Sequence, residues 1–220
     1  MTDAMVRETL TVGDAAEAAH VGKIARLLAV KVAAQERMRF ALGAVRFSSA
    51  PDGWLRMDAT NGRILVRVEA LGVILPTPGR LAGSLLVARD TLKRLRSGDG
   101  LYVTEGGELA QTDPRGETIR TLRTDEDGTF PNVDDVIPAQ TFSTDRFRWD
   151  KFALSPALLG DVLAVAESLA SGRTDPPPVR FSYSAPPLGS DGRPVGAPLR
   201  LDAQTPYFRF IGIIMPVELG

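Results

Sequence analysis

Two basic helical stretches carry the side chains best suited to binding an anion. Lys23 and Arg26 fall on the side of the first predicted helix that is opposite to its apolar residues, and Lys93 and Arg96 do the same in the second. Between residues 15 and 35 of the first helix the only acid is Glu17, near its start, where the helix dipole favours it. The shortage of neighbouring acids predicts surfaces of one sign that attract phosphates. An ordinary solvated helix face explains the same pattern, and the sequence leaves both interpretations open.

The remaining polar residues offer no catalytic constellation. His20 is the only histidine, and it stands in an alanine-rich helix without a nucleophile nearby in the sequence. The acids at 125–127 and 134–135 lie in predicted loops, where solvated charges are much commoner than ligands of a divalent ion. The sequence contains no phosphate-binding loop, dinucleotide fingerprint or metal-ligand spacing. We therefore expect a protein that is not an enzyme and that needs no cofactor or metal.

The C-terminal stretch from Tyr207 to Gly220 is the second feature with a functional interpretation. It begins with alternating apolar and polar residues, becomes continuously apolar, and reaches a proline before a short tail. One interpretation is a strand that closes a sheet. The other is that Met215, Pro216 and Leu219 line an exposed apolar cleft for a partner.

The elements that must position these residues form a repeat of strand, helix and three strands. Turn signals such as Pro51-Asp52-Gly53 and Asn61-Gly62 separate the strands. The predicted helices cover residues 15–37, 89–96 and 156–171. The three units span residues 8–75, 84–124 and 147–216. This order predicts an α+β fold of antiparallel sheets with helices on one face. It divides the chain into a two-unit domain (1–128), a linker (129–146) and a one-unit half-domain (147–220).

Composition narrows the class of protein. Of 220 residues, 44% are hydrophobic and 24% charged, and the formal net charge is −1, which is typical of a globular chain with a real core. No apolar run is long enough to span a membrane, and the absence of cysteine excludes disulfides and fits a cytoplasmic protein. The nearly neutral charge argues against a tight nucleic-acid binder that uses its whole surface, but it allows a basic patch.

Three separated segments resemble one family, the bacterial DNA polymerase III beta subunit, or sliding clamp. Residues 55–65, Leu-Arg-Met-Asp-Ala-Thr-Asn-Gly-Arg-Ile-Leu, resemble the family's strand–turn–strand segment, which usually reads Ala-Thr-Asp-Gly-x-Arg-Leu. Residues 130–138, which begin Phe-Pro-Asn-Val, are similar to the segment that joins clamp domains. Residues 213–219, Ile-Ile-Met-Pro-Val-Glu-Leu, resemble the family's C-terminal Val-Met-Pro-Met-Arg-Leu. The chain departs from the family at Asn61, Arg63 and Glu218, and it offers three repeat units where clamp domains hold two each.

The resemblance implies a processivity factor that forms a homo-oligomeric ring around double-stranded DNA and tethers polymerase and clamp-loader peptides in an apolar cleft. The alternative is an adaptor or regulator of the same fold that binds partner peptides without encircling DNA. The implied cleft residues are Leu42, Thr60, Gly62, Arg63, Leu65, Pro131, Val136, Ile213, Met215, Pro216 and Leu219. The residues implied to face DNA, through weak and non-specific contacts to phosphates, are Lys23, Arg26, Lys93 and Arg96.

Overall fold

The computed structural model describes residues 12–35, 40–70, 81, 83–123, 129–138, 153–170, 175–183 and 198–215. Its helical elements are α1 (Val12–Leu27), the π-helical turn η1 (Leu28–Val32), the 3-10 turn η2 (Phe40–Gly43), α2 (Arg89–Lys93), α3 (Val133–Val136) and α4 (Pro156–Glu167). Its strands are β1 (Ala44–Ser49), β2 (Leu55–Thr60), β3 (Ile64–Ala70), β4 (Leu85–Ala88), β5 (Gly100–Val103), β6 (Leu109–Thr112), β7 (Thr118–Leu122), β8 (Arg180–Tyr183), β9 (Leu199–Gln204) and β10 (Phe208–Ile214).

The described strands form two antiparallel sheets. The larger has seven strands in the order β4-β1-β2-β3-β10-β9-β8, and the smaller has the order β5-β6-β7. β10 pairs with β3 along its whole length, from Phe208 opposite Ala70 to Ile214 opposite Ile64. The strands of the third unit therefore continue the sheet of the first. The division into a domain, a linker and a half-domain stays a prediction, and these strands join its first and last parts in one sheet.

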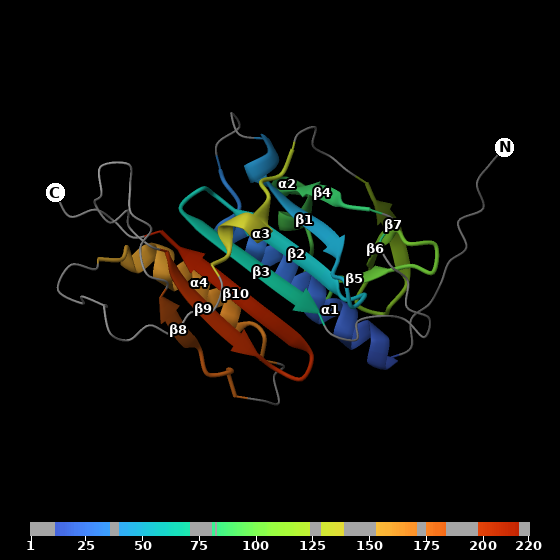
Figure 1. Cartoon of the computed structure of the whole chain (residues 1–220). Coiled ribbons are helices and arrows are strands. Elements are labelled where there is room, and N and C mark those ends of the chain that lie inside the picture. The colour runs from blue at the N-terminus through green and yellow to red at the C-terminus, as the bar shows by residue number, and fades with distance from the viewer. Residues whose placement is uncertain are drawn as a thin grey trace.

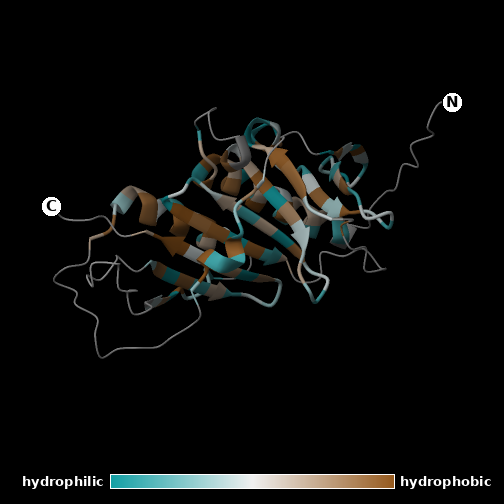
Figure 2. Cartoon of the chain, turned by 45° about the horizontal axis from the view of Figure 1, so that its top comes forward, coloured by the Kyte–Doolittle hydropathy of each residue, from teal (hydrophilic) through white to brown (hydrophobic). Residues whose placement is uncertain are grey.

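The core lies between the large sheet and the helices, on what we call the inner face. α1 and α4 lie on this face and α3 lies on the opposite, outer face (Figure 1). Side chains of a strand alternate between faces; in β10, Phe208, Phe210 and Ile214 point inward and are buried. Figure 2 shows this mixture of apolar and polar residues along the strands. The apolar stripe predicted for the first helix is confirmed, because its members are all completely buried: Val21, Ile24, Leu28 and Val32.

Small residues bring α1 against β5 of the smaller sheet. A Cβ added to Gly22 would lie 2.3 Å from the carbonyl oxygen of Asp99, and one added to Gly100 would lie 2.8 Å from the Cβ of Ala18. The two backbones can approach so closely only because these side chains are missing. This contact holds the loop before β5 beside the exposed strip of α1.

The outer face of the large sheet carries a network of charged side chains that crosses the strands. Asp58 accepts hydrogen bonds from Arg46 (2.6 Å) and Arg67 (2.8 Å), which lie opposite it on β1 and β3. In the same way, Glu69 binds Arg56 (2.8 Å) and Arg209 (3.0 Å) on β2 and β10. Opposite charges on neighbouring strands suit this register. The buried carboxylates, Asp58 and Glu69, are each bound on both sides, as buried charges must be.

The predicted fold class is confirmed: antiparallel sheets have α1, α2 and α4 on one face. The helix expected over residues 15–37 ends at Val32, because the backbone of Ala33 is extended. The N–H of Ala33 makes the last bond of η1, to the carbonyl of Leu28. The first strand, β1, begins at Ala44, directly after η2. The linker contains α3, a one-turn helix that the sequence analysis did not anticipate.

Candidate functional site

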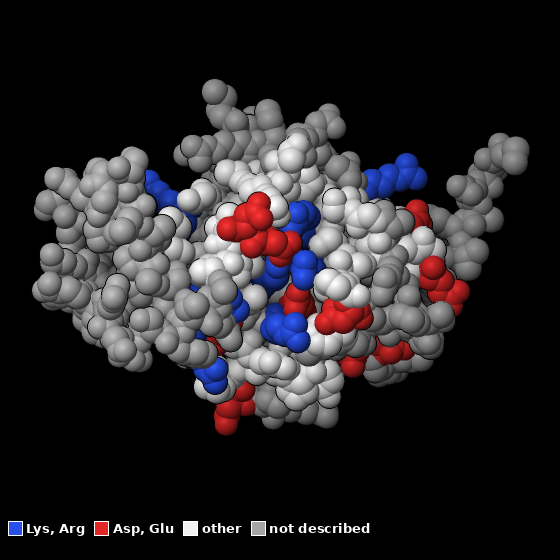
Figure 3. Space-filling model, in the orientation of Figure 1, with Lys and Arg blue, Asp and Glu red and all other residues white. Residues whose placement is uncertain are grey.

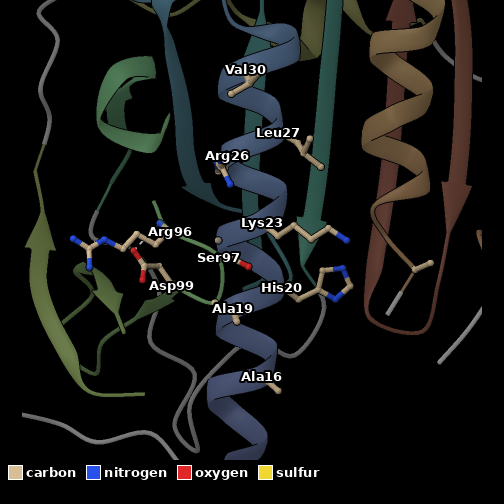
Figure 4. A pocket seen from close by; sticks show the side chains of 13 residues that line it. Ala16, Ala19, His20, Lys23, Arg26, Leu27, Val30, Arg96, Ser97 and Asp99 are labelled. Atoms are coloured by element: carbon tan, nitrogen blue, oxygen red, sulfur yellow. Dashed lines mark hydrogen bonds between the residues drawn. The ribbon is translucent and has the colours of Figure 1, made fainter. Parts of the chain in front are cut away.

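The exposed strip of α1 forms the floor of a groove on the inner face, which we call the inner groove. It has a volume of about 720 Å³, and it lies between the loop after α2 on one side and the end of α4 on the other (Figure 4). The sequence places small residues and cations on this strip at helical spacing. The lining residues are Ala16, Ala19, His20, Gly22, Lys23, Arg26, Leu27, Val30, Arg96, Ser97, Gly98, Asp99 and Ala170.

Three of the four cations predicted to face DNA line the inner groove. Lys23 and Arg96 lie on opposite sides of α1, and Arg26 lies above both of them in this view (Figure 4). All three side chains are exposed, whereas Asp99, the acid in the lining, is 5% exposed. Lys93 is also exposed but does not line the groove. The groove therefore presents cations to solvent while its acid is turned inward.

Asp99 holds the loop that positions Arg96. Its Oδ2 accepts hydrogen bonds from the backbone N–H of Arg96 (2.9 Å) and from Nε2 of Gln111 on β6 (2.9 Å). These bonds satisfy the buried carboxylate and fix the loop next to α1. The position of Arg96 is therefore set by the contact between α1 and β5.

His20 joins α1 to α4. Its Nε2 lies 2.7 Å from the carbonyl oxygen of Ser168, and its ring packs 4.6 Å from the ring of Phe208. Burial lowers the pKa of His20, with a smaller contribution from the charge of Lys23, and the bond to Ser168 acts in the opposite direction. These contacts agree with the structural role expected for this histidine.

The α4 side of the inner face has a different charge from the α1 side. α4 contains no lysine or arginine, and its acids are Asp161 and Glu167. Asp161 pairs with Lys31 of η1 at 3.1 Å, which neutralises one cation of the first unit. The cations that line the inner groove therefore come from α1 and the loop before β5, and none comes from α4.

Six of the eleven predicted cleft residues lie at one end of the large sheet, where β3 and β10 meet. Leu65 and Ile213 lie directly opposite each other, and the N–H of Met215 donates to the carbonyl of Arg63 at 2.9 Å. Thr60 and Gly62 lie at the turn before β3: Thr60 Oγ1 donates to the carbonyl of Ile64 (2.7 Å) and accepts from the N–H of Gly62 (3.1 Å). Segments about 150 residues apart in the chain thus form one end of the sheet.

This end of the sheet has both buried and exposed apolar residues. Leu65 and Ile213 are buried beneath α3, in an apolar cluster that we call the outer cluster, while Val136 and Met215 are 44% and 41% exposed. Arg63 and Gly62 are exposed, and Leu42 and Pro131 are half-buried. The members of the outer cluster are Ala44, Leu65, Leu86, Phe130, Val133 and Ile213. We call the surface around Val136, Met215 and Arg63 the outer cleft.

An ion pair holds α3 over the sheet. Asp134 accepts a 2.6 Å hydrogen bond from Nη1 of Arg67, whose side chain is 5% exposed and also binds Asp58. The pKa of Asp134 is lowered, chiefly by the hydrogen bond from Arg67. Burial alone would lower the pKa of Arg67, but its bonds to Asp58 and Asp134 leave it raised. Figure 3 shows cations gathered in the hollow of this face, with acids beside them.

Some residues of this site were absent from the sequence analysis. Phe130, Val133 and Ile137 pack on the buried floor, and Ile211 packs beside Ile213. The alternation of β10, which places residues 211, 213 and 215 on one face, is the signal that finds Ile211. Pro216 and Leu219, which the sequence analysis placed in the cleft, lie outside the described residues.

Searches of the described residues for other kinds of site gave negative results. No group of three or more histidine, aspartate or glutamate side chains in these parts of the chain is arranged to hold a metal ion. No described helix is long and apolar enough to cross a membrane.

Comparisons with known proteins identify the fold. Neither a protein-family model nor a curated protein matches this sequence. Among solved structures, the chain is similar to the Helicobacter pylori beta clamp in complex with 3,4-difluorobenzamide, with a TM-score of 0.50, 11% identity, and coverage of 92% of this chain and 65% of that chain. It is also similar to DNA polymerase III subunit beta from Borrelia burgdorferi in complex with a natural product (TM-score 0.46, 15% identity, coverage 93% and 63%). A third is the Bartonella birtlesii sliding clamp bound to griselimycin (TM-score 0.45, 15% identity, coverage 97% and 66%).

The chain thus spans 63% to 66% of the length of these three proteins. The H. pylori structure carries the fold assignment, and it agrees with the resemblance found in the sequence. The protein has the fold of the bacterial DNA polymerase III beta sliding clamps.

Proposed function

We propose that this protein is a clamp-like processivity factor that holds replication or repair proteins on duplex DNA. Peptides of a polymerase or clamp loader bind in the outer cleft, and DNA phosphates face the inner groove. The observation that carries the proposal is the meeting of Arg63, Leu65, Ile213 and Met215 at the β3–β10 junction, with Val133 of the linker packed in the same cluster. An apolar surface with polar groups at its rim suits a short linear peptide.

The peptide site is tested by adding a charge to its exposed apolar surface. Met215→Glu and Val136→Glu should each weaken binding of a fluorescein-labelled peptide with adjacent leucine and phenylalanine by tenfold or more, about 1.4 kcal/mol, because a carboxylate would lose water against apolar side chains. Ile119→Glu is the matched control, since Ile119 is 48% exposed on β7 of the other sheet. Equal affinities for all three variants would exclude the outer cleft as the peptide site.

The DNA site is tested by reversing charges in the inner groove. Lys23→Glu with Arg26→Glu should weaken binding of duplex DNA strongly at low salt and little at high salt, because phosphate contacts release counterions. Arg115→Glu with Arg123→Glu makes the same change in net charge at exposed positions outside the groove. If both double variants show the same salt dependence, the residues of the groove belong to an ordinary solvated surface.

A ring requires several copies of the chain. Retention on circular nicked DNA that is lost on linearisation, together with a closed oligomer in solution, is the outcome expected of an encircling clamp. The second candidate is an adaptor of the same fold that binds peptides without encircling DNA. The absence of cations from α4 favours this candidate, since a helix that faces phosphates gains from positive charge. A monomer by light scattering that still binds the peptide would establish it.

A further inference from the structure

A second groove, which we call the arginine groove, lies on the third unit. It has a volume of about 420 Å³ and crosses β8, β9 and β10. Its outward-facing residues on β9 and β10 include Arg200, Asp202, Arg209 and Ile211. The full lining is Pro178, Val179, Arg180, Arg200, Asp202, Ala203, Gln204, Arg209, Phe210 and Ile211.

The arginine groove is continuous with the outer cleft. Ile211 lines the groove and also packs against the outer cluster that forms the floor of the cleft. Arg200 lines the groove, and its Nη1 donates to the carbonyl of Pro138 at the end of the linker, at 2.6 Å. A peptide of a few more residues than the cleft accommodates would therefore pass into the groove.

The groove contains three arginines and one aspartate; Asp202 pairs with Arg200, and Arg180 and Arg209 are the cations exposed to solvent. The side chain of Arg209 is 41% exposed; its Nη1 donates to Glu69 at 3.0 Å, and its guanidinium lies 4.7 Å from the centre of the Trp54 ring. A guanidinium has five N–H groups, so this bond leaves Arg209 with further donors. The contacts with Trp54 and Glu69 fix the direction of the side chain.

Arg200 is also held in place before any ligand arrives. Its Nε lies 3.0 Å from both carboxylate oxygens of Asp202, and its Nη2 lies 2.7 Å from Oδ1. Planar guanidinium groups bind carboxylates in paired geometry, and pre-ordered side chains lose less entropy on binding. Arg180 is exposed on the neighbouring strand β8.

Acidic residues on α3, across the outer cleft from the arginine groove, favour binding of a negatively charged ligand in the groove. Asp134 and Asp135 are exposed on α3, with the side chain of Asp134 62% exposed. They repel a carboxylate there, whereas the arginine groove attracts it. On the outer face, exposed acids therefore lie on α3, and exposed arginines lie on β8 and β10.

We propose that the arginine groove binds acidic residues that flank the apolar residues of a partner peptide held in the outer cleft. This inference rests on the proposed peptide-binding function and names the chemistry of the partner beyond its apolar residues. The apolar residues anchor the peptide, and the flanking carboxylates select among partners with similar apolar residues.

The test compares labelled peptides with one Leu-Phe segment and either three glutamates or three glutamines on one side of it, with both sides tried. One acidic peptide should bind about fivefold to tenfold more tightly than its neutral counterpart at low salt, the size expected of two partly exposed ion pairs, with Arg180 and Arg209. This difference should shrink at high salt. Arg209→Gln and Arg180→Gln should each reduce it, while Arg115→Gln, at an exposed turn outside the groove, should not.

The neutral peptides serve as the control for folding, because they use the outer cleft alone. If they bind the wild-type protein and the acidic peptides bind no better, the groove has no such role and the cleft assignment stands. The same conclusion follows if the preference for acid is unchanged in Arg209→Gln and Arg180→Gln. If none of the peptides binds at all, the proposed peptide-binding function fails and this inference fails with it.

Discussion

Gly22 is expected to be essential for the packing of α1 on β5. Glycine inside a helix costs about 1 kcal/mol relative to alanine, so alanine would be the better residue here unless packing excluded it. A Cβ at this position would lie 2.3 Å from the carbonyl oxygen of Asp99, 3.3 Å from its carbonyl carbon and 3.4 Å from the Cα of Gly100. Since the nearest atom belongs to the backbone, relief requires α1 and β5 to separate.

The expected magnitude follows from two opposing effects. Overpacking of a core costs about 1–3 kcal/mol, and a contact with backbone belongs at the upper end of that range. After the gain in helix propensity of about 1 kcal/mol, Gly22→Ala should lower the free energy of unfolding by about 2 kcal/mol, or the melting temperature by about 4–8 °C for a chain of this size. Gly160→Ala is the matched control. Gly160 lies in α4, and apart from its chain neighbours and its own helix backbone no atom lies within 4 Å of an added Cβ, so this change should raise the free energy of unfolding by up to about 1 kcal/mol.

Urea denaturation of the two variants beside the wild-type protein is the assay. Gly22→Ala should lower the urea concentration at the midpoint of unfolding, whereas Gly160→Ala should raise it, and the shift should be larger for Gly22→Ala. Gly22→Ala should also change the inner groove. Arg96 lies in the loop before β5, and this loop can lie close to α1 only because residue 22 is a glycine. If Gly22→Ala is as stable as Gly160→Ala, the close contact of α1 with β5 is wrong, and so is this account of how Arg96 is positioned.

Two further changes test the outer face. The pKa of Asp134 is lower in the folded protein, so its stabilising contribution is complete above its ordinary value of about 3.9 and is lost as the pH falls through the folded value. The protection of α3 against hydrogen exchange, measured relative to the intrinsic exchange rate at each pH, should therefore fall below about pH 4 in the wild-type protein. Asp134→Asn should have lower protection already at neutral pH, and this protection should change little with acid. Equal protection in the two proteins at neutral pH would show that the bond to Arg67 does not hold α3. Asn61→Ala should lower the free energy of unfolding by about 1–2 kcal/mol, measured by urea denaturation. Asn61 Oδ1 accepts hydrogen bonds from two backbone N–H groups of the β2–β3 turn, at 2.9 and 3.0 Å, and alanine would remove both bonds. An unchanged denaturation midpoint would mean that water replaces them.

Local patterns were enough to predict most elements of the fold. The stripe from Val21 to Val32 has helical spacing, and each of its four members is buried as expected. The hairpin at Asn61-Gly62 needs a residue with positive φ, and Gly62 has a φ of 85°. Ser155 followed by Pro156 predicts the start of α4, and Ser155 does accept from the N–H of Leu158. These features depend on residues close in sequence, so the sequence reveals them.

The remaining features depend on contacts between distant segments. The pairing of β10 with β3 joins residues about 140 apart, and nothing in either strand specifies the other except a shared alternation. Arg67 and Glu69 look like ordinary exposed residues of a half-buried strand, yet both are buried by partners from other segments. Asp134 was assigned to a solvated loop, whereas it binds Arg67 across 67 positions. The resemblance to the clamp family grouped Arg63 and Leu65 with Ile213 and Met215, which do meet in the sheet, because it carries information on tertiary contacts that spacing lacks.

The two proposed sites should act independently of each other. The inner groove is built on α1 and the loop before β5, while the outer cleft lies beyond the buried core and the large sheet, on the opposite face. Coupling between sites requires an element with two arrangements that both ligands influence, and a packed sheet with satisfied charges at Asp58 and Glu69 resists rearrangement. We therefore expect the affinity for DNA to change less than about twofold when the cleft is saturated with peptide, which is about 0.4 kcal/mol. A larger change in a binding cycle measured with both ligands would mean that the sheet transmits a structural change, and that loading of a partner alters the hold on DNA.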